Sequence, residues 1–176
     1  KTFGFDMELH EARRVIKIYR ETNHKINKLW RDAQLFLKDG NTFGLYGVLF
    51  VEDGKILLPS GLHLRYDDLQ FTTTDKGVEF DYKTRRGRVR IYGGKVIENV
   101  CQAIARCIIG EQMLQIAKRY RVVLTVHDSI ACCVKDEEVD EAQQYVEECM
   151  RQPPEWAEGL PIDCESGTGK SYGECE

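Results

Sequence analysis

The chain has 176 residues, of which 42% are hydrophobic and 31% charged, and a formal net charge of −4. This length suits one globular domain, or one domain with an appended piece, and allows a sizeable core. The composition is typical of soluble globular proteins, and no apolar run approaches the roughly 20 residues that span a bilayer, so we expect no membrane partner.

The charges are distributed unevenly along the chain. From Asp136 onward acidic residues outnumber basic ones by 11, which leaves a charge of +7 on the preceding part. A basic body with an acidic end region can bind a polyanion on one face, although the overall isoelectric point conceals it. The chain begins without Met or a signal peptide, so we expect it to be a piece of a longer protein or a processed one.

The seven cysteines indicate a reducing, cytoplasmic environment. Their number is odd, and several lie within apolar patterns, where a free thiol acts as a small hydrophobic group. A zinc site is not expected, because the sequence has no CxxC pair, and Cys132 and Cys133 are neighbours that face opposite ways on a strand.

The first 70 residues predict helices followed by strands. Apolar residues recur at helical spacing over residues 9–37, with a break at Asn23-His24 and an end near residues 39–41. Residues 48–51 and 56–58 then predict a β-hairpin, and residues 62–66 alternate as a half-exposed strand on which His63 is a surface residue.

A basic segment separates two further predicted strands, residues 78–82 and 89–92. It reads KTRRGRVR over residues 83–90, five cations in eight residues, with Gly87 allowing a close approach of the backbone. Such a cluster suits phosphate contacts, but a solvated hairpin turn explains it equally well, and the segment alone does not decide between them.

Residues 95–120 predict the longest helix, with a wide apolar stripe. Asn99 and Gln102 lie three residues apart, and therefore on one face of that helix. Side-chain amides can donate to base edges in a minor groove, although exposed helix residues of this kind usually have no such role.

Residues 121–134, RVVLTVHDSIACCV, predict a β-hairpin with a tight turn at His127, Asp128 and Ser129. Its arms are apolar nearly throughout, so we expect both faces of the sheet to be covered. An imidazole and a carboxylate would then lie on a rigid support, as chemistry requires, although turn formation alone also explains these residues. An amphipathic acidic helix over residues 137–150 follows, and residues 160–164 predict a final strand.

Two of these segments resemble a known family. Residues 92–106, YGGKVIENVCQAIAR, and residues 126–129, VHDS, look like the C-terminal part of a family A (polymerase I-like) DNA polymerase of the bacteriophage type. Shorter likenesses, in the same order, cover most of the chain, from the N-terminal helices and the segment LPSG at 58–61 to the C-terminus.

The resemblance implies an α+β fragment of a template-directed DNA polymerase, an enzyme that transfers nucleotides from dNTPs to a primer 3′-hydroxyl. Residues 1–44 would be a helical remnant of the fingers, and residues 45–176 the C-terminal part of the palm, with a palm-type antiparallel sheet packed by helices. The hairpin would carry polymerase motif C, in which Asp128 is a catalytic metal ligand for two Mg²⁺ ions shared with a second carboxylate.

The resemblance also assigns a primer–template DNA interface. His127 would contact the primer 3′ end, and Gln102 the minor groove near the terminal base pair. Asn99 is a further candidate on the same helix. The residues implied to hold DNA phosphates are Arg85, Arg86, Arg88 and Lys95.

The sequence departs from the family pattern at several points. Ser129 stands where the family usually has a second acidic residue, and neither the other palm carboxylate motif nor the fingers helix that binds the dNTP is present. We therefore expect the isolated chain to be inactive. The alternatives are a DNA-binding module without chemistry, one subunit of a split polymerase whose missing N-terminal half is a separate chain, and an unrelated α+β domain.

Overall fold

The computed structural model describes residues 7–39, 50–52, 54–75 and 77–175 as a mixture of helices and antiparallel sheets. The α+β class expected from the sequence is therefore confirmed. The chain divides into two compact units, Lys1–Leu58 with His63–Val100, and Pro59–Leu62 with Cys101–Glu176. No helix in the described part is long and apolar enough to cross a membrane.

Two helices begin the described part of the first unit. They are α1 (Leu9–Thr22) and α2 (His24–Asp39), and the break between them falls at Asn23, as the sequence predicts. A capping box closes the start of α1, since Glu8 and Glu11 bond reciprocally to the backbone of the first turn. The predicted end of α2 at Gly40 and Asn41, and the boundary at residue 44, lie outside the described residues.

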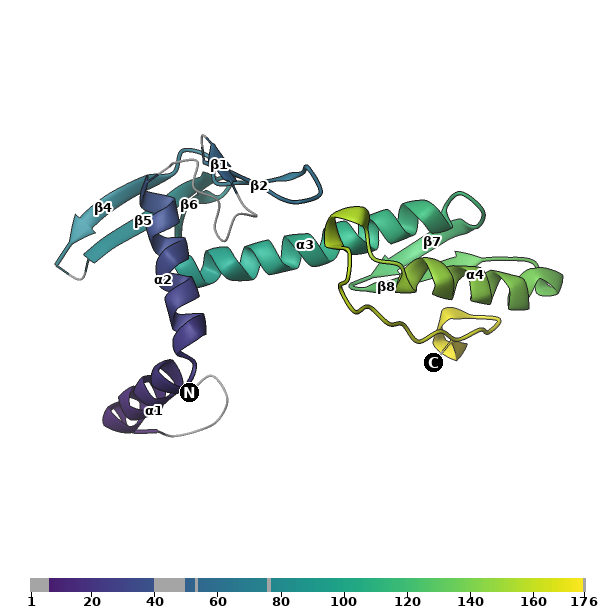
Figure 1. Cartoon of the computed structure of the whole chain (residues 1–176), viewed down its shortest axis with the longest axis horizontal. Helices are drawn as coiled ribbons and strands as arrows, with labels where there is room; N and C mark the ends of the chain where they lie inside the picture. Colours follow the sequence, from purple (N-terminus) through teal and green to yellow (C-terminus); the bar gives the residue numbers. More distant parts are fainter. Residues whose placement is uncertain (1–6, 40–49, 53, 76, 176) are drawn as a thin grey trace. The chain divides into compact units, whose positions relative to one another are not determined.

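The strands of the first unit form two antiparallel sheets in the described part (Figure 1). The first contains β1 (Phe50–Glu52), β2 (Lys55–Leu57) and β3 (His63–Arg65), with His63 exposed. The second contains β4 (Gln70–Thr74), β5 (Gly77–Thr84) and β6 (Gly87–Ile91). The hairpins at 50–57 and 77–91 are as predicted, whereas β4 was missed, although its run of three threonines favours a strand.

The long helix α3 (Gly93–Ile116) begins two residues before the predicted start, because Gly93 fits against α2. The backbone N–H of Gly93 donates to Gln34 Oε1 at 2.6 Å, and Gln34 Nε2 donates to the Val78 carbonyl at 3.3 Å. Gln34 therefore ties α2 to β5 and to the first turn of α3. The division between the units falls within this helix, because Val100 belongs to the first unit and Cys101 to the second.

The second unit combines β7 (Arg121–Val126), β8 (Ser129–Cys133) and α4 (Val139–Arg151), which Figure 1 labels. Its core contains Ile116 at the end of α3, Tyr120 in the turn that follows, and Ala142 and Cys149 from α4. Short 3₁₀ turns lie at Asp136–Glu138, Glu155–Ala157 and Tyr172–Glu174. Gln112 is buried in this unit, and its Nε2 donates to the Met150 carbonyl at 2.6 Å, which fixes the end of α4.

The β7–β8 hairpin is covered on one face, not on both as the sequence predicts. Val122, Ile130 and Cys132 pack against the core of the second unit, whereas Val123, Leu124 and Val126 are 47%, 43% and 38% exposed. A register shift between Val122 and Leu124 places two successive side chains on the outer face. Apolar residues along both strands therefore do not mean that this chain covers both faces of the hairpin.

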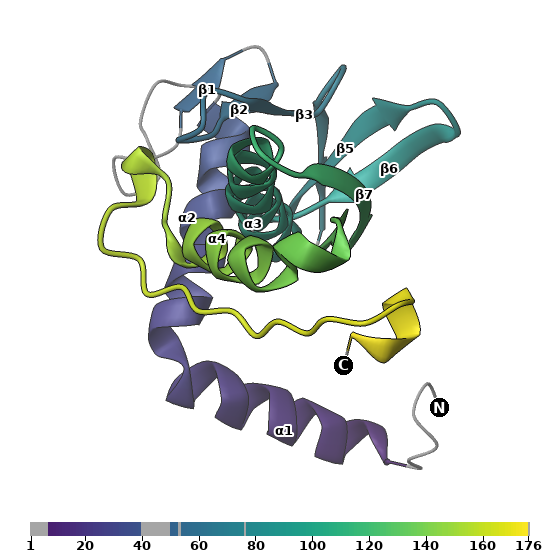
Figure 2. The same cartoon turned by 90° about the vertical axis from the view of Figure 1, so that its right-hand side faces the viewer.

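The predicted final strand at residues 160–164 is also wrong, because these residues are not in a strand and pair with none of the described strands. They run as an extended segment beside α4, as both cartoons show (Figures 1 and 2). Side-chain contacts hold the segment in place of a backbone ladder, and a strand pattern in the sequence cannot distinguish these two arrangements.

Candidate functional site: an exposed carboxylate turn and a basic hairpin tip

The turn between β7 and β8 presents His127 and Asp128 to solvent. Val126 pairs with Ser129, so the loop has two residues, and His127 has a φ of +53°. Positive φ in a two-residue hairpin loop matches the right-handed twist of the strands, and His tolerates it better than most residues. The inward side chains of both strands anchor the hairpin on α3 and α4, so the turn rests on a packed support.

Asp128 is available for a ligand in this chain. In the described ranges, neither its carboxylate nor the His127 ring takes part in a hydrogen bond or ion pair, and both residues are exposed. The same part of the chain contains no group of three or more His, Cys, Asp or Glu side chains that could hold a metal ion. Asp128 can therefore supply one carboxylate, but the described residues do not by themselves complete a Mg²⁺ site.

The basic segment forms the tip of the β5–β6 hairpin. Arg85 and Arg86 occupy the loop and are exposed, and Gly87 has a φ of +121° that favours glycine. Thr84 closes the loop, because its hydroxyl donates to the Gly87 carbonyl at 2.7 Å and accepts from the Arg86 backbone N–H at 3.2 Å. The tip thus displays two guanidinium groups from a hydrogen-bonded turn.

Arg88 lies in a different environment from its two neighbours at the tip. Its Nε donates to Asp81 Oδ1, and its Nη1 donates to Asp68 Oδ2 at 2.6 Å. Hydrogen bonds to Asp81 and Asp68 raise the pKa of Arg88 above its ordinary value, and Arg88 and Gln70 lower the pKa of Asp68. No local sequence pattern predicts this contact, because Asp68 is 20 residues from Arg88.

Lys95 and Asn99 also have partners in the first unit. Lys95 Nζ bonds to Glu98 at 2.8 Å on the exposed surface of α3. The Asn99 amide donates to the hydroxyl of buried Tyr66 at 3.0 Å, and burial raises the pKa of that tyrosine. Asn99 therefore has a packing role whatever else it does.

Gln102 is exposed on α3, with no hydrogen bond to another described residue. It lies in the second unit together with His127 and Asp128, whereas Asn99, Lys95 and the three arginines belong to the first. The candidate residues therefore form two groups, one in each unit. Each group is carried by its own sheet and by a part of α3.

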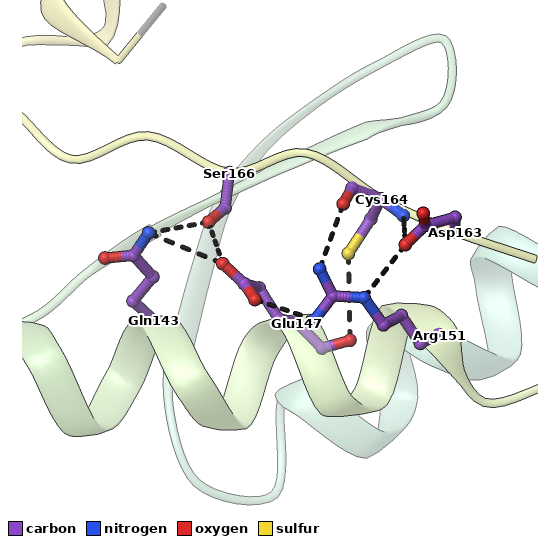
Figure 3. A network of polar contacts seen from close by, with 6 residues as sticks. All are labelled: Gln143, Glu147, Arg151, Asp163, Cys164 and Ser166. Carbon is purple, nitrogen blue, oxygen red and sulfur yellow. Dashed lines mark hydrogen bonds and ion pairs between the residues drawn. The ribbon is translucent and has the colours of Figure 1, made fainter.

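A polar network holds the extended C-terminal segment on α4 (Figure 3). Arg151 donates to Asp163 at 2.9 Å and to Glu147 at 2.7 Å, and its Nη2 donates to the Cys164 carbonyl at 3.2 Å. Ser166 donates to Glu147 and accepts from Gln143 at 2.7 Å. The network replaces the strand pairing that the sequence predicts for this segment.

We expect this segment to leave α4 in acid. Hydrogen bonds from Arg151 lower the pKa of Asp163, and bonds from Ser166 and Arg151 lower that of Glu147. Because the pKa of each carboxyl group is lowered in the folded state, the charged carboxylates stabilise the contact fully above the ordinary carboxyl pKa of about 4. This stabilisation is lost as the pH falls through the lower pKa of the folded state. Limited proteolysis at pH 7, 5 and 3, with a protease active at each pH, should show that the protection of residues 163–166 from cleavage is lost only below pH 4.

The Arg151→Met variant should show the same loss of protection already at pH 7. Lys135→Met, which removes an exposed ion pair with Glu138 outside the network, is the matched control. Equal protection of residues 163–166 in Arg151→Met and the unmodified chain would contradict the assignment.

Comparison with known proteins adds one relation. No protein-family model matches the chain, and no solved structure matches it significantly. Among curated proteins, a DNA polymerase of Bacillus phage SP02 is 31% identical over 176 residues. The chain is therefore similar to a DNA polymerase. The match covers 86% of this chain but 26% of that enzyme, so the chain spans about a quarter of the relative's length.

Proposed function

We propose that this chain is part of a template-directed DNA polymerase of family A, bacteriophage type, and that it forms the C-terminal part of the palm. The observation that carries the proposal is the exposed His127–Asp128 turn, on a packed hairpin, in a chain similar to a phage DNA polymerase. In this assignment the β7–β8 hairpin is motif C, and the complete enzyme adds dNTP units to a primer 3′ end.

Asp128 is the proposed metal ligand of the complete enzyme. Hard Mg²⁺ ions prefer oxygen ligands, and an exposed carboxylate at a rigid turn meets that requirement. Bound Mg²⁺ would supply charge neutralisation for phosphoryl transfer. Since the described residues hold no complete ligand set, further carboxylates would come from parts of the enzyme that this chain does not span. His127, next to it, is the proposed contact to the primer end.

Gln102 and the basic tip are the proposed contacts to primer–template DNA. An exposed amide on a helix can donate to base edges in a minor groove, and exposed guanidinium groups suit phosphates. Asn99 and Lys95 contribute less to this interface, because each already has a partner within the chain.

A second candidate is one subunit of a split polymerase, and the exposed outer face of the β7–β8 hairpin favours it. The uncovered side chains of Val123, Leu124 and Val126 could pack against polypeptide from another chain. Under this reading, adding the partner subunit restores primer extension to the chain. A fused enzyme requires no such addition.

Salt-dependent DNA binding tests the proposal. The unmodified chain should bind a primer–template duplex with an affinity that falls as salt rises, because phosphate contacts release counterions. Arg85→Gln and Arg86→Gln should each reduce the slope of log K against log salt by about 0.9, the value for one lost phosphate contact. Fluorescence anisotropy with a labelled duplex at several salt concentrations measures both quantities.

Lys55→Gln is the matched control, because it removes an exposed cation from β2, in the other sheet of the same unit. Its slope should equal that of the unmodified chain. Equal slopes in all four proteins, or binding that does not respond to salt, would exclude the proposed interface.

A further inference from the structure

The cations of the β5–β6 hairpin divide into two groups by their contacts. Arg88 bonds to Asp81 and Asp68, and Arg90 forms an ion pair with Glu79 at 2.8 Å. In contrast, the side chains of Lys83, Arg85 and Arg86 have no hydrogen bond or ion pair with other described residues. Neighbouring cations in one short basic run therefore differ in what they can still bind.

The guanidinium of Arg88 is nearly saturated by the protein. Besides the two carboxylates, its Nη2 donates to the carbonyls of Asp68 at 2.8 Å and Asp81 at 3.2 Å. Most of its N–H donors are consequently engaged, in the forked arrangement that only an arginine provides. A phosphate would have to displace existing charge-assisted bonds in order to reach it.

These contacts join three segments of the first unit. Arg88 lies on β6, Asp81 on β5, and Asp68 in the turn before β4, where it adopts a φ of +50°. The Lys83 backbone N–H also donates to the Asp67 carbonyl at 2.8 Å. The turn is thus fastened to the hairpin just below its tip, and Gln70 supports it by donating to Asp68 at 3.0 Å.

We infer that Lys83, Arg85 and Arg86 form the phosphate-binding tip, and that Asp68 and Asp81 act through Arg88 as positioning residues that hold it. The inference rests on the proposed function, because DNA is the polyanion it concerns. Within the basic segment, Lys83, Arg85 and Arg86 then contact phosphate, whereas Arg88 orders the hairpin tip that carries them. Two acidic residues thereby support binding to an anion.

The test compares Arg88→Lys and Arg88→Gln with Arg86→Gln in the full chain. If Arg88 positions the tip, both Arg88 variants weaken duplex binding about fivefold, because the loop that carries the tip side chains must then be ordered on binding. Their salt slopes stay at the unmodified value, whereas the Arg86→Gln slope falls by about 0.9. Lysine does not rescue, because one ammonium group cannot replace the fork that joins both carboxylates.

Amide exchange of residues 84–87 in the DNA-free chain reports on how firmly Arg88, Asp68 and Asp81 hold the tip. It should speed up in both Arg88 variants, and in Asp81→Asn, but not in Lys55→Gln. Full rescue of affinity by Arg88→Lys, a lower slope in Arg88→Gln, or unchanged exchange at the tip would each overturn the inference. Absence of salt-dependent binding by the unmodified chain would instead refute the proposed function, and the exchange result would still report on the contact.

Discussion

In the complete polymerase that we propose for this chain, replacing Asp128 by Asn is expected to lower nucleotide incorporation about 1000-fold. A metal ion contributes several kcal/mol of transition-state stabilisation, and each 1.4 kcal/mol or so corresponds to a factor of ten in rate. The amide retains the size of the side chain and the exposed turn, but it lacks the negative charge that binds Mg²⁺. Steady-state primer extension with Mg²⁺ measures the effect.

Two controls make this result specific. Glu137→Gln removes an exposed carboxylate from the 3₁₀ turn after the hairpin and should leave the rate within a factor of two or so. Affinity for primer–template DNA should not fall in Asp128→Asn, since the substitution removes a negative charge. The isolated 176-residue chain should incorporate no nucleotide. A rate close to normal in Asp128→Asn would refute the proposed role of the hairpin turn.

Replacing Gly93 by Ala is expected to destabilise the first unit by about 3 kcal/mol or more, at the upper end of overpacking effects. A Cβ at Gly93 would lie 1.9 Å from the Trp30 carbonyl oxygen and 2.7 Å from the Gln34 backbone nitrogen. Both are backbone atoms of α2, which cannot rotate away as a side chain would. The substitution therefore separates α2 from α3 and breaks the 2.6 Å bond from Gly93 to Gln34.

Gly110→Ala is the matched control, because it lies in the same helix with no atom within 4 Å of the added Cβ. Alanine should stabilise α3 there by about 0.5–1 kcal/mol through its helix propensity. Since the units can unfold separately, amide exchange of residues 30–38 and 93–99 is the appropriate measurement for Gly93→Ala. Protection equal to that of the unmodified chain would show that the contact between α2 and α3 is not rigid.

The local elements were largely readable from the sequence. Helical spacing with a break at Asn23-His24 predicted α1 and α2, and the polar interruption of an apolar run at His127 predicted the β7–β8 turn. Such signals are local, because they depend on backbone preferences and on periodicity within about ten residues. The position of Asp128 in that turn followed from the same pattern, whereas its exposure is a finding of the structure.

What covers each element was decided by tertiary structure. The apolar arms of the hairpin predicted a sheet buried on both faces, but Val123, Leu124 and Val126 on its outer face are exposed in this chain. The strand predicted at 160–164 is instead held by Arg151, because side-chain bonds there take the place of a ladder. Neither the exposed face of the hairpin nor the side-chain bonds at residues 160–164 can be predicted from the local sequence pattern.

The same division applies to the candidate site. The sequence by itself determined which residues are basic, which carboxylate lies at the hairpin turn, and where Gln102 falls on the long helix. Only the tertiary structure showed that Arg88 is held by Asp68 and Asp81, whereas Arg85 and Arg86 have no hydrogen bond or ion pair with another described residue. The physical reason is that a charge pattern records where cations lie along the chain, whereas their availability depends on carboxylates brought from distant segments by folding.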